Sequence, residues 1–328
     1  MIVLVTGASG FVGSHVAEQL ARAGHHVRAL VRATSNVDFL QTLPGLEFVT
    51  GAIDEPSTLA DAVAGVDGIV HAAGLIKARS SHEFHRCNAG GTANLLAAAR
   101  AHAPGLERFV LVSSVAATAP SPDGSPVAND VEPRPVTDYG RSKLAAERLA
   151  RAQAAHLPVT ILRPPMVYGP RDRETCQLFR AAARRVLPFL GDPEGKLSLV
   201  YGPDCARACA LALTADVPSG STYFVTDGRV YTRRDLLVGL ERAVDRRALV
   251  SFPLPASFLR AAALVGETYG LFSGRAVMLT RQKLDELLAQ WVCDGSDAER
   301  ALGFRPEVDW FEGSRLAARW YREQGWLS

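Results

Sequence analysis

The sequence predicts an α/β protein, with a doubly wound parallel sheet and a smaller C-terminal lobe. Short apolar, β-branched runs alternate with longer amphipathic segments in the first half. Few polar residues interrupt these runs, which is typical of parallel strands covered by helices on both faces. After residue 164 the elements become shorter and richer in Pro, Gly and Arg. We therefore expect a first domain at residues 1–164 and a substrate-binding lobe at residues 165–328, some segments of which can return to the first domain.

The predicted elements follow in order along the chain. Apolar runs predict strands at residues 2–5, 27–31, 47–49, 68–71, 109–113 and 159–162. Amphipathic spacing predicts helices at residues 14–23, 92–102 and 141–156, and two more at residues 281–291 and 314–323 near the end. Because crossovers between parallel strands are right-handed, these elements wind into one sheet with helices on both faces.

Composition excludes several classes of protein. The chain is 48% hydrophobic and 21% charged, which favours a folded core over disorder. Its 36 basic and 34 acidic residues leave a formal charge of +2, too small to suggest nucleic-acid binding. No apolar run reaches the roughly 18 residues of a membrane span, and the first residues do not resemble a signal peptide. The five cysteines form no CxxC pair. We expect a cytoplasmic, metal-free protein with reduced cysteines and no integral membrane segment.

A glycine-rich turn connects the first predicted strand to the first predicted helix. Gly7, Gly10 and Gly13 allow the backbone to turn tightly and approach a pyrophosphate, which the N–H groups of the helix N-terminus can bind. An acidic residue after the second strand would hold the ribose 2′-hydroxyl of NAD. Arg32 stands there instead and suits the 2′-phosphate of NADP. The turn therefore predicts a dinucleotide site that prefers NADP, with NAD as the alternative.

Tyr139 and Lys143 are four residues apart and share one face of a predicted helix. A phenol titrates near pH 10 on its own, and an adjacent ammonium favours the phenolate and lowers its pKa. The pair can then exchange a proton with a substrate oxygen while a nicotinamide gives or takes hydride. Ser113 and Ser114 close an apolar strand whose carboxyl end faces the cofactor crevice, so one hydroxyl can bind the reacting oxygen.

These motifs occur in a recognisable order along nearly the whole chain. They comprise residues 6–13, 71–74, 88–94, 113–114, 139–143 and 162–170, with a tail pattern at residues 291–294 and 302–306. Together they resemble an extended short-chain dehydrogenase/reductase, the NAD-dependent epimerase/dehydratase superfamily, which has a Rossmann fold. The resemblance implies an enzyme that binds a nicotinamide dinucleotide and a small-molecule substrate. It also implies a homodimer formed through the helices at residues 92–102 and 141–156.

The resemblance implies a role for individual residues. Ser114 would be the catalytic hydroxyl, Tyr139 the acid/base, Lys143 the ligand of the nicotinamide ribose, and Asn88 a helix residue near the active site. His71 would flank the ribose and pyrophosphate without acting as a catalyst. The cofactor-binding residues would be Gly7, Ser9, Gly10, Phe11, Val12, Gly13, Arg32, Ile53, Ala72, Ala73, Tyr139, Lys143, Pro165 and Val167.

Departures from the family pattern indicate the branch. Val115 and Ala116 replace the Asp-Glu pair with which family dehydratases eliminate water, so dehydration lacks its second acid and base. Pro165 and Met166 replace an Asn-containing stretch that contacts sugar nucleotides in epimerases. Ala52 stands where many members have an Asp that reads the adenine. The first two departures resemble the 3β-hydroxysteroid dehydrogenase-like and dihydroflavonol-reductase-like branches.

Several segments of the predicted lobe are apolar and suit an apolar substrate, such as a sterol, a steroid or an aromatic alcohol. They include Phe179, residues 186–190, residues 253–259, Leu271 and Phe272. The same residues could simply form the core of the lobe. The sequence thus favours an oxidoreductase that interconverts a secondary alcohol and a ketone. The alternatives are a nucleotide-sugar epimerase with tightly bound NAD and a non-catalytic dinucleotide sensor.

Overall fold

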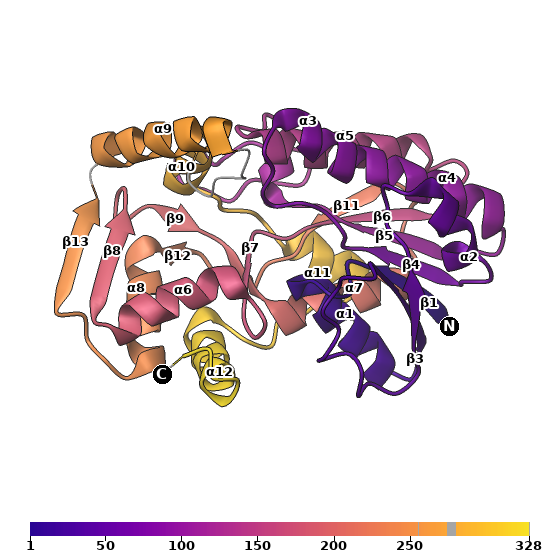
Figure 1. The fold of residues 1–328 in the computed structure, drawn as a ribbon, viewed down its shortest axis with the longest axis horizontal. Coiled ribbons are helices and arrows are strands. Elements are labelled where there is room, and N and C mark those ends of the chain that lie inside the picture. Colours follow the sequence, from indigo (N-terminus) through magenta and orange to yellow (C-terminus); the bar gives the residue numbers. More distant parts are fainter. Residues whose placement is uncertain (255, 274–279, 328) are drawn as a thin grey trace.

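The computed structural model describes residues 1–254, 256–273 and 280–327, apart from the side chains of residues 188–190, 252, 253, 256 and 268–273. Its larger part is built on a parallel sheet of seven strands in the order β11-β6-β5-β4-β1-β2-β3 (Figure 1). The strands are β1 (Ile2–Thr6), β2 (His26–Val31), β3 (Leu46–Thr50), β4 (Gly68–His71), β5 (Arg108–Val112), β6 (Val159–Arg163) and β11 (Ser221–Phe224). This confirms the predicted doubly wound α/β fold.

Helices cover both faces of the sheet, because the strands are apolar on both faces. One face packs against α1 (Phe11–Arg22), α7 (Gly202–Thr214) and α11 (Ser296–Leu302). The other packs against α2 (Leu59–Val63), α4 (Gly91–His102) and α5 (Asp138–Ala152). Short helical turns connect these elements: η1 (Pro56–Thr58), α3 (Ser81–Phe84), η2 (His85–Gly90) and η3 (Val115–Ala117). The sheet thus lies between two separate apolar cores. These cores hold in place the carboxyl ends of its strands.

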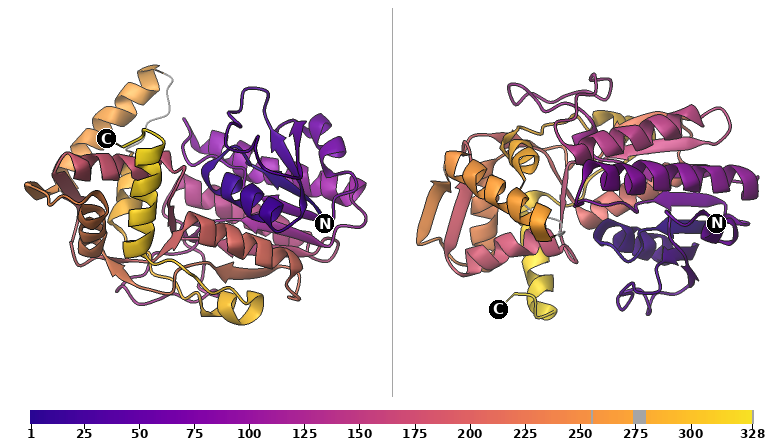
Figure 2. Two further views of the ribbon diagram at one scale, coloured as in Figure 1. Left: turned by 90° about the horizontal axis from the view of Figure 1, so that it is seen from below. Right: turned by 45° about the horizontal axis from the view of Figure 1, so that its top comes forward.

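The smaller part is a lobe with three two-stranded sheets. Their strands are β7 (Met166–Tyr168) with β10 (Leu199–Tyr201), β8 (Val186–Leu190) with β13 (Val250–Leu254), and β9 (Lys196–Leu197) with β12 (Tyr231–Thr232). Its helices are α6 (Arg173–Ala183), α8 (Arg233–Val244), α9 (Ala256–Ser273), α10 (Arg281–Leu288) and α12 (Trp310–Glu323). Figure 2 shows α12 along the side of the lobe that faces the sheet. No described helix is long and apolar enough to cross a membrane.

Three elements after residue 164 belong to the larger part: α7, β11 and α11, which packs against α7 and β11. Strand β11 pairs in parallel with β6, with Tyr223 opposite Leu162, and α7 packs against α1. The chain therefore enters the lobe, returns to complete the sheet with α7 and β11, enters the lobe again, and returns once more with α11 before it ends in α12. A single cut at 164/165 does not separate the two parts, because segments of the second half return to the first domain.

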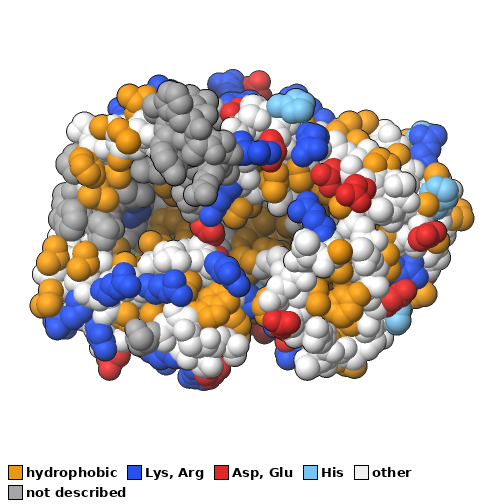
Figure 3. All heavy atoms as spheres, in the orientation of Figure 1, with side chains coloured by type: hydrophobic (Ala, Val, Ile, Leu, Met, Phe, Trp, Pro, Cys, Tyr) orange, Lys and Arg blue, Asp and Glu red, His pale blue; other side chains and the backbone are white. Residues whose placement is uncertain are grey.

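The two parts are joined by polar contacts at the carboxyl edge of the sheet. The His15 ring lies 2.9 Å from the Pro170 carbonyl oxygen, and Arg171 pairs with Glu18 at 2.5 Å. Lys77, in the loop after β4, pairs with Glu174 of α6 at 2.6 Å. In the space-filling view a hollow lies between the two parts, with hydrophobic side chains on its floor and charged side chains on its rim (Figure 3).

Candidate active site

In the glycine-rich turn after β1 the backbone segments lie so close together that side chains on the glycines would not fit. Gly7 has a φ of +72°, and a Cβ there would lie 2.7 Å from the Ala73 nitrogen. A Cβ on Gly13 would lie 2.1 Å from the Gly7 carbonyl oxygen. The turn is closed by a hydrogen bond of 2.9 Å from the Gly10 N–H to that same oxygen. The positions of these glycines are therefore fixed by backbone packing between the ends of β1 and β4.

Helix α1 begins directly after this turn. Its N-cap is Gly10, which offers no side chain to the first-turn N–H groups. Free N–H groups at a helix N-terminus bind anions, so the residues present fit the pyrophosphate of a dinucleotide. Ser9, Phe11 and Val12 are partly exposed around this terminus. The cradle contains every turn residue that the sequence analysis assigned to the cofactor.

Arg32 follows β2 with an exposed side chain. Its guanidinium makes no ion pair or hydrogen bond with any residue that the structure describes. Its backbone N–H donates to the Ser35 hydroxyl at 3.1 Å, and its carbonyl accepts from the Ser35 N–H at 2.9 Å. Ile53, in the turn after β3, is 4% exposed and its carbonyl accepts from Asn94 at 2.9 Å. The Arg32 guanidinium is therefore exposed and without a partner among the described residues, whereas the Ile53 side chain is part of the core; contact of either residue with a dinucleotide stays a prediction.

His71 closes β4 as a buried, neutral imidazole. It lies between the hydroxyls of Thr6 and Thr92, at 2.7 and 2.9 Å. Burial, assisted by the charge of Lys143, lowers the pKa of His71 to about 3. Both ring nitrogens are engaged by threonine hydroxyls, so the ring ties β4 to β1 and α4; its expected position beside the ribose and pyrophosphate stays a prediction. The backbone of Ala72 and Ala73 instead lies against the glycine-rich turn.

Asn88 lies in η2, where all of its amide atoms are committed. Its Oδ1 accepts from the Leu75 N–H at 2.7 Å, and its Nδ2 donates to the Leu75 carbonyl at 3.0 Å and to the Ser142 hydroxyl at 2.9 Å. The side chain fastens the loop after β4 to the first turn of α5. These bonds show Asn88 in a positioning arrangement, and its expected part in catalysis stays a prediction.

The two serines that end β5 have different environments. Ser113 is buried and donates to Oε1 of Glu147 at 2.6 Å. Ser114 is partly exposed, and its oxygen accepts from the Ala116 N–H at 3.2 Å, which leaves its own proton to donate. Of the two serines, Ser114 is therefore the one beside Tyr139, with which it shares a hydrogen bond; its role as the catalytic hydroxyl stays a prediction.

Tyr139 and Lys143 lie in the first two turns of α5, which begins three residues earlier than predicted because the Thr137 hydroxyl caps the Gly140 N–H at 3.0 Å. Burial raises the pKa of Tyr139 to about 12, and a hydrogen bond with Ser114 opposes the rise. Lys143 is not among the groups that shift this pKa; a lowering by the ammonium together with the positive charge of a bound, oxidised nicotinamide stays a prediction. Lys143 donates to the Val112 carbonyl at 2.8 Å, and burial lowers its own pKa to about 8.

A buried ion pair beneath this site was missed by the sequence analysis. Glu147 is fully buried and accepts from Arg163 through both oxygens, at 2.8 and 2.7 Å. It also holds Ser113, and its charge raises the pKa of Lys143 against the effect of burial. The signal was present in the sequence, because Glu147 is one helical turn beyond Lys143 and Arg163 ends the neighbouring strand.

Part of the expected apolar substrate wall is lobe core instead. Phe179 is fully buried, with its ring centroid 5.2 Å from that of Tyr321, and Leu187 belongs to the same cluster. Phe179 of α6 packs against Tyr321 of α12, and β8 packs against α6. The side chains of residues 188–190, Leu271 and Phe272 lie outside the described residues. Pro165 and Val167 stay at the start of the lobe, beside the carboxyl end of β6.

The fold and this site define an extended short-chain dehydrogenase/reductase. The model of the NAD dependent epimerase/dehydratase family matches residues 3–225, and the chain belongs to that family. It is a NAD(P)-dependent oxidoreductase of this class.

Named relatives extend over almost the full chain. A ceramide reductase of Caulobacter vibrioides is 33% identical, covering 99% of this chain and 96% of that protein. A 2-alkyl-3-oxoalkanoate reductase of Stenotrophomonas maltophilia is 30% identical, and the match covers 96% of this chain and 98% of that protein. The chain in the crystal structure of gox2253 is 29% identical in sequence and superposes with a TM-score of 0.82. The match covers 100% of this chain and 99% of that chain.

Proposed function

We propose that this protein reduces a ketone on an apolar substrate to a secondary alcohol and prefers NADP(H). The observation that carries the proposal is the pairing of Ser114 and Tyr139, two hydroxyl donors at the carboxyl end of β5 and the start of α5. With a pKa near 12 the phenol is protonated at neutral pH. It can therefore donate its proton to an oxygen that gains negative charge.

The other residues support the same chemistry. Ser114 donates a hydrogen bond to the substrate oxygen and stabilises the charge that develops there. Lys143 is placed to bind the nicotinamide ribose and to bring a positive charge near the reacting oxygen. The bound nicotinamide supplies the hydride. Arg32 supports NADP over NAD, since its guanidinium is free to pair with a 2′-phosphate.

The substrate class is narrowed by the relatives and by the hollow between the two parts. The names of the two reductases describe aliphatic compounds, and both enzymes act in the reductive direction by name. The apolar floor of the hollow suits such a chain (Figure 3). Among apolar ketones, an aliphatic substrate is therefore favoured over a sterol or an aromatic one.

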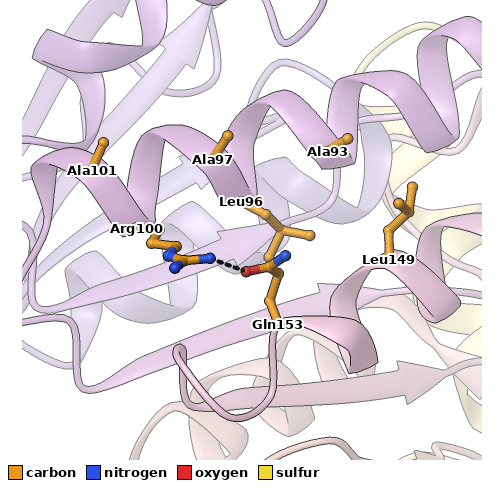
Figure 4. A pocket seen from close by; sticks show the side chains of 7 residues that line it. All are labelled: Ala93, Leu96, Ala97, Arg100, Ala101, Leu149 and Gln153. Atoms are coloured by element: carbon orange, nitrogen blue, oxygen red, sulfur yellow. Dashed lines mark hydrogen bonds between the residues drawn. The ribbon is translucent and has the colours of Figure 1, made fainter.

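We also propose a homodimer through α4 and α5. The outer face of these helices carries a shallow pocket of about 390 Å³, lined by Ala93, Leu96, Ala97, Arg100, Ala101, Leu149 and Gln153 (Figure 4). Leu149 is 38% exposed there, and small side chains permit close helix packing. Light scattering of the wild type and of L149E tests this: a dimer that L149E converts to a monomer is expected, and a monomeric wild type contradicts it.

The reductase proposal is tested by matched serine variants and by Tyr139→Phe. NAD(P)H oxidation is followed with a panel of aliphatic, aromatic and steroidal ketones. Y139F should lose about 100- to 10,000-fold in kcat and S114A about 100- to 1,000-fold, while dinucleotide binding persists. S113A is the control, because its hydroxyl faces Glu147 rather than the crevice. Unchanged turnover in Y139F would refute the assignment.

A further inference from the structure

Helix α10 of the lobe is docked on the start of α5, beside Tyr139. The Gln282 Oε1 accepts from the Asp138 N–H at 2.8 Å and from Arg141 at 3.3 Å, and Gln282 Nε2 donates to Asp138 Oδ2 at 3.2 Å. These bonds join residues 141 to 144 positions apart in sequence. Helix α10 thus forms a wall of the site next to the proton donor.

Glu286 lies one turn beyond Gln282, on the same face of α10. Its side chain is 14% exposed, and Oε1 pairs with Lys283 at 2.6 Å. The other oxygen, Oε2, is buried and has no hydrogen-bond partner among the residues that the structure describes. Trp291 fixes the helix here by donating its indole N–H to the Glu286 carbonyl at 2.8 Å.

No hydrogen bond between described residues joins the Glu286 carboxylate to the Tyr139 phenol. The negative charge of Glu286 acts on Tyr139 through space and raises the pKa of the phenol, whereas the hydrogen-bonding partner of that phenol is Ser114. Phe84 completes the surroundings, with its ring centroid 6.0 Å from that of Tyr139. The Gln282–Asp138 bonds place this turn of α10 against the start of α5, so the unpartnered Oε2 of Glu286 lies on the helix that borders the Tyr139 site.

A buried acceptor without a donor is unfavourable, and carboxylates form the stronger hydrogen bonds. We infer that Glu286 is a specificity-determining residue that accepts a hydrogen bond from a hydroxyl or amide N–H next to the reacting carbonyl of the substrate. This rests on the proposed ketone reduction and narrows its substrate to hydroxy- or acylamino-substituted ketones. A neutral donor fits better than an ammonium, because Lys283 already balances the charge of the carboxylate.

The test uses three aliphatic ketones of equal chain length: the plain ketone, its β-hydroxy derivative and its α-acetamido derivative. Wild-type protein should prefer at least one derivative over the plain ketone by about ten- to a hundredfold in kcat/KM, the value of one hydrogen bond to a charged group. In E286L this ratio should fall to near one, and E286Q should keep part of it. Which derivative is preferred distinguishes a hydroxyl donor from an amide donor.

D285N is the matched control, since Asp285 is the adjacent carboxylate on α10 and is 58% exposed. Its ratio should equal that of the wild type. A ratio that is unchanged in E286L, with all three ketones slowed alike, would overturn the inference and leave the reductase intact. So would a shift of the pH profile without a change in the ratio.

Binding provides a readout that does not depend on turnover. The alcohols that correspond to the three ketones are titrated calorimetrically into wild type and E286L in the presence of dinucleotide. The wild type should bind at least one substituted alcohol more tightly than the plain alcohol by about ten- to a hundredfold in Kd, and E286L should lose this preference. Equal affinities for all three alcohols in the wild type would refute the inference. Absence of turnover with a retained, Glu286-dependent binding preference would refute the proposed reductase alone.

Discussion

The replacement Glu147→Gln tests whether the site rests on its buried ion pair. Glu147 is fully buried, Arg163 is 2% exposed, and they are joined by two hydrogen bonds. Removing the negative charge leaves the guanidinium buried without its counter-ion. Breaking a buried pair in this way costs about 3–5 kcal/mol. We therefore expect E147Q to lose that much of its free energy of unfolding.

Two weaker interactions of Glu147 add to the expected loss of unfolding free energy. Arg151 also reaches Glu147, at 3.1 Å, but it is 36% exposed and adds at most about 1 kcal/mol. Loss of the Ser113 hydrogen bond adds about 1 kcal/mol. The control is E307Q, which breaks a pair with Arg207 on a carboxylate that is 70% exposed. That change should stay within about 0.5 kcal/mol.

Urea unfolding followed by circular dichroism and by tryptophan fluorescence measures both variants. The midpoint of E147Q should fall well below that of E307Q, while the slopes stay alike. A loss in E147Q of less than about 1 kcal/mol would refute the reasoning, because it would mean that Arg163 finds other partners or water. The pKa of Lys143 should also fall in E147Q, since the charge that raises it is gone.

Three further predictions concern the cofactor site and acid stability. Gly13→Ala places a Cβ 2.1 Å from the Gly7 carbonyl, and the forced backbone shift should raise the dinucleotide Kd by about ten- to a hundredfold; an unchanged fluorescence titration would contradict the fit. Arg32→Ala should reduce the preference for NADPH over NADH by about tenfold or more, measured as the ratio of the two Kd values, and equal weakening of both cofactors would argue against a 2′-phosphate contact. His71 has a pKa of about 3 in the folded chain against 6.5 ordinarily, so the unfolded state binds more protons between these values and stability falls as the pH falls. From about pH 7 to about pH 5 this costs about 2 kcal/mol, and urea midpoints that do not fall would contradict a neutral buried ring.

Much of the sheet could be predicted from local patterns. The strands around residues 2–6, 68–71 and 159–163 are apolar on both faces, and this pattern needs no knowledge of distant contacts. Strand β11 was missed because Ser221 and Thr222 give it little apolar character, and it is specified by pairing with β6. The start of α5 was predicted late because its cap is the hydroxyl of Thr137.

In the candidate site, too, some features follow from local sequence patterns and others from distant contacts. Gly7, Gly13, Tyr139 and Lys143 are set by local geometry, so their motifs sufficed to find them. The Ser113 hydroxyl is held by a hydrogen bond to Glu147. This contact spans 34 positions of the sequence, and no local pattern encodes it. The pKa of Tyr139 likewise follows from burial beneath the lobe, which the sequence does not display.

The central claim is net reduction with exchange of the cofactor. The most direct measurement mixes wild-type protein with excess NADPH and a responsive aliphatic ketone, and counts nicotinamide oxidised and alcohol formed in the same sample. The account predicts many turnovers per chain, with one alcohol formed for each NADPH consumed, and native mass spectrometry of the resting protein should show no permanently retained NAD. Stoichiometric NAD that stays bound, with inversion of a nucleotide sugar and no net consumption of NADPH, would contradict it.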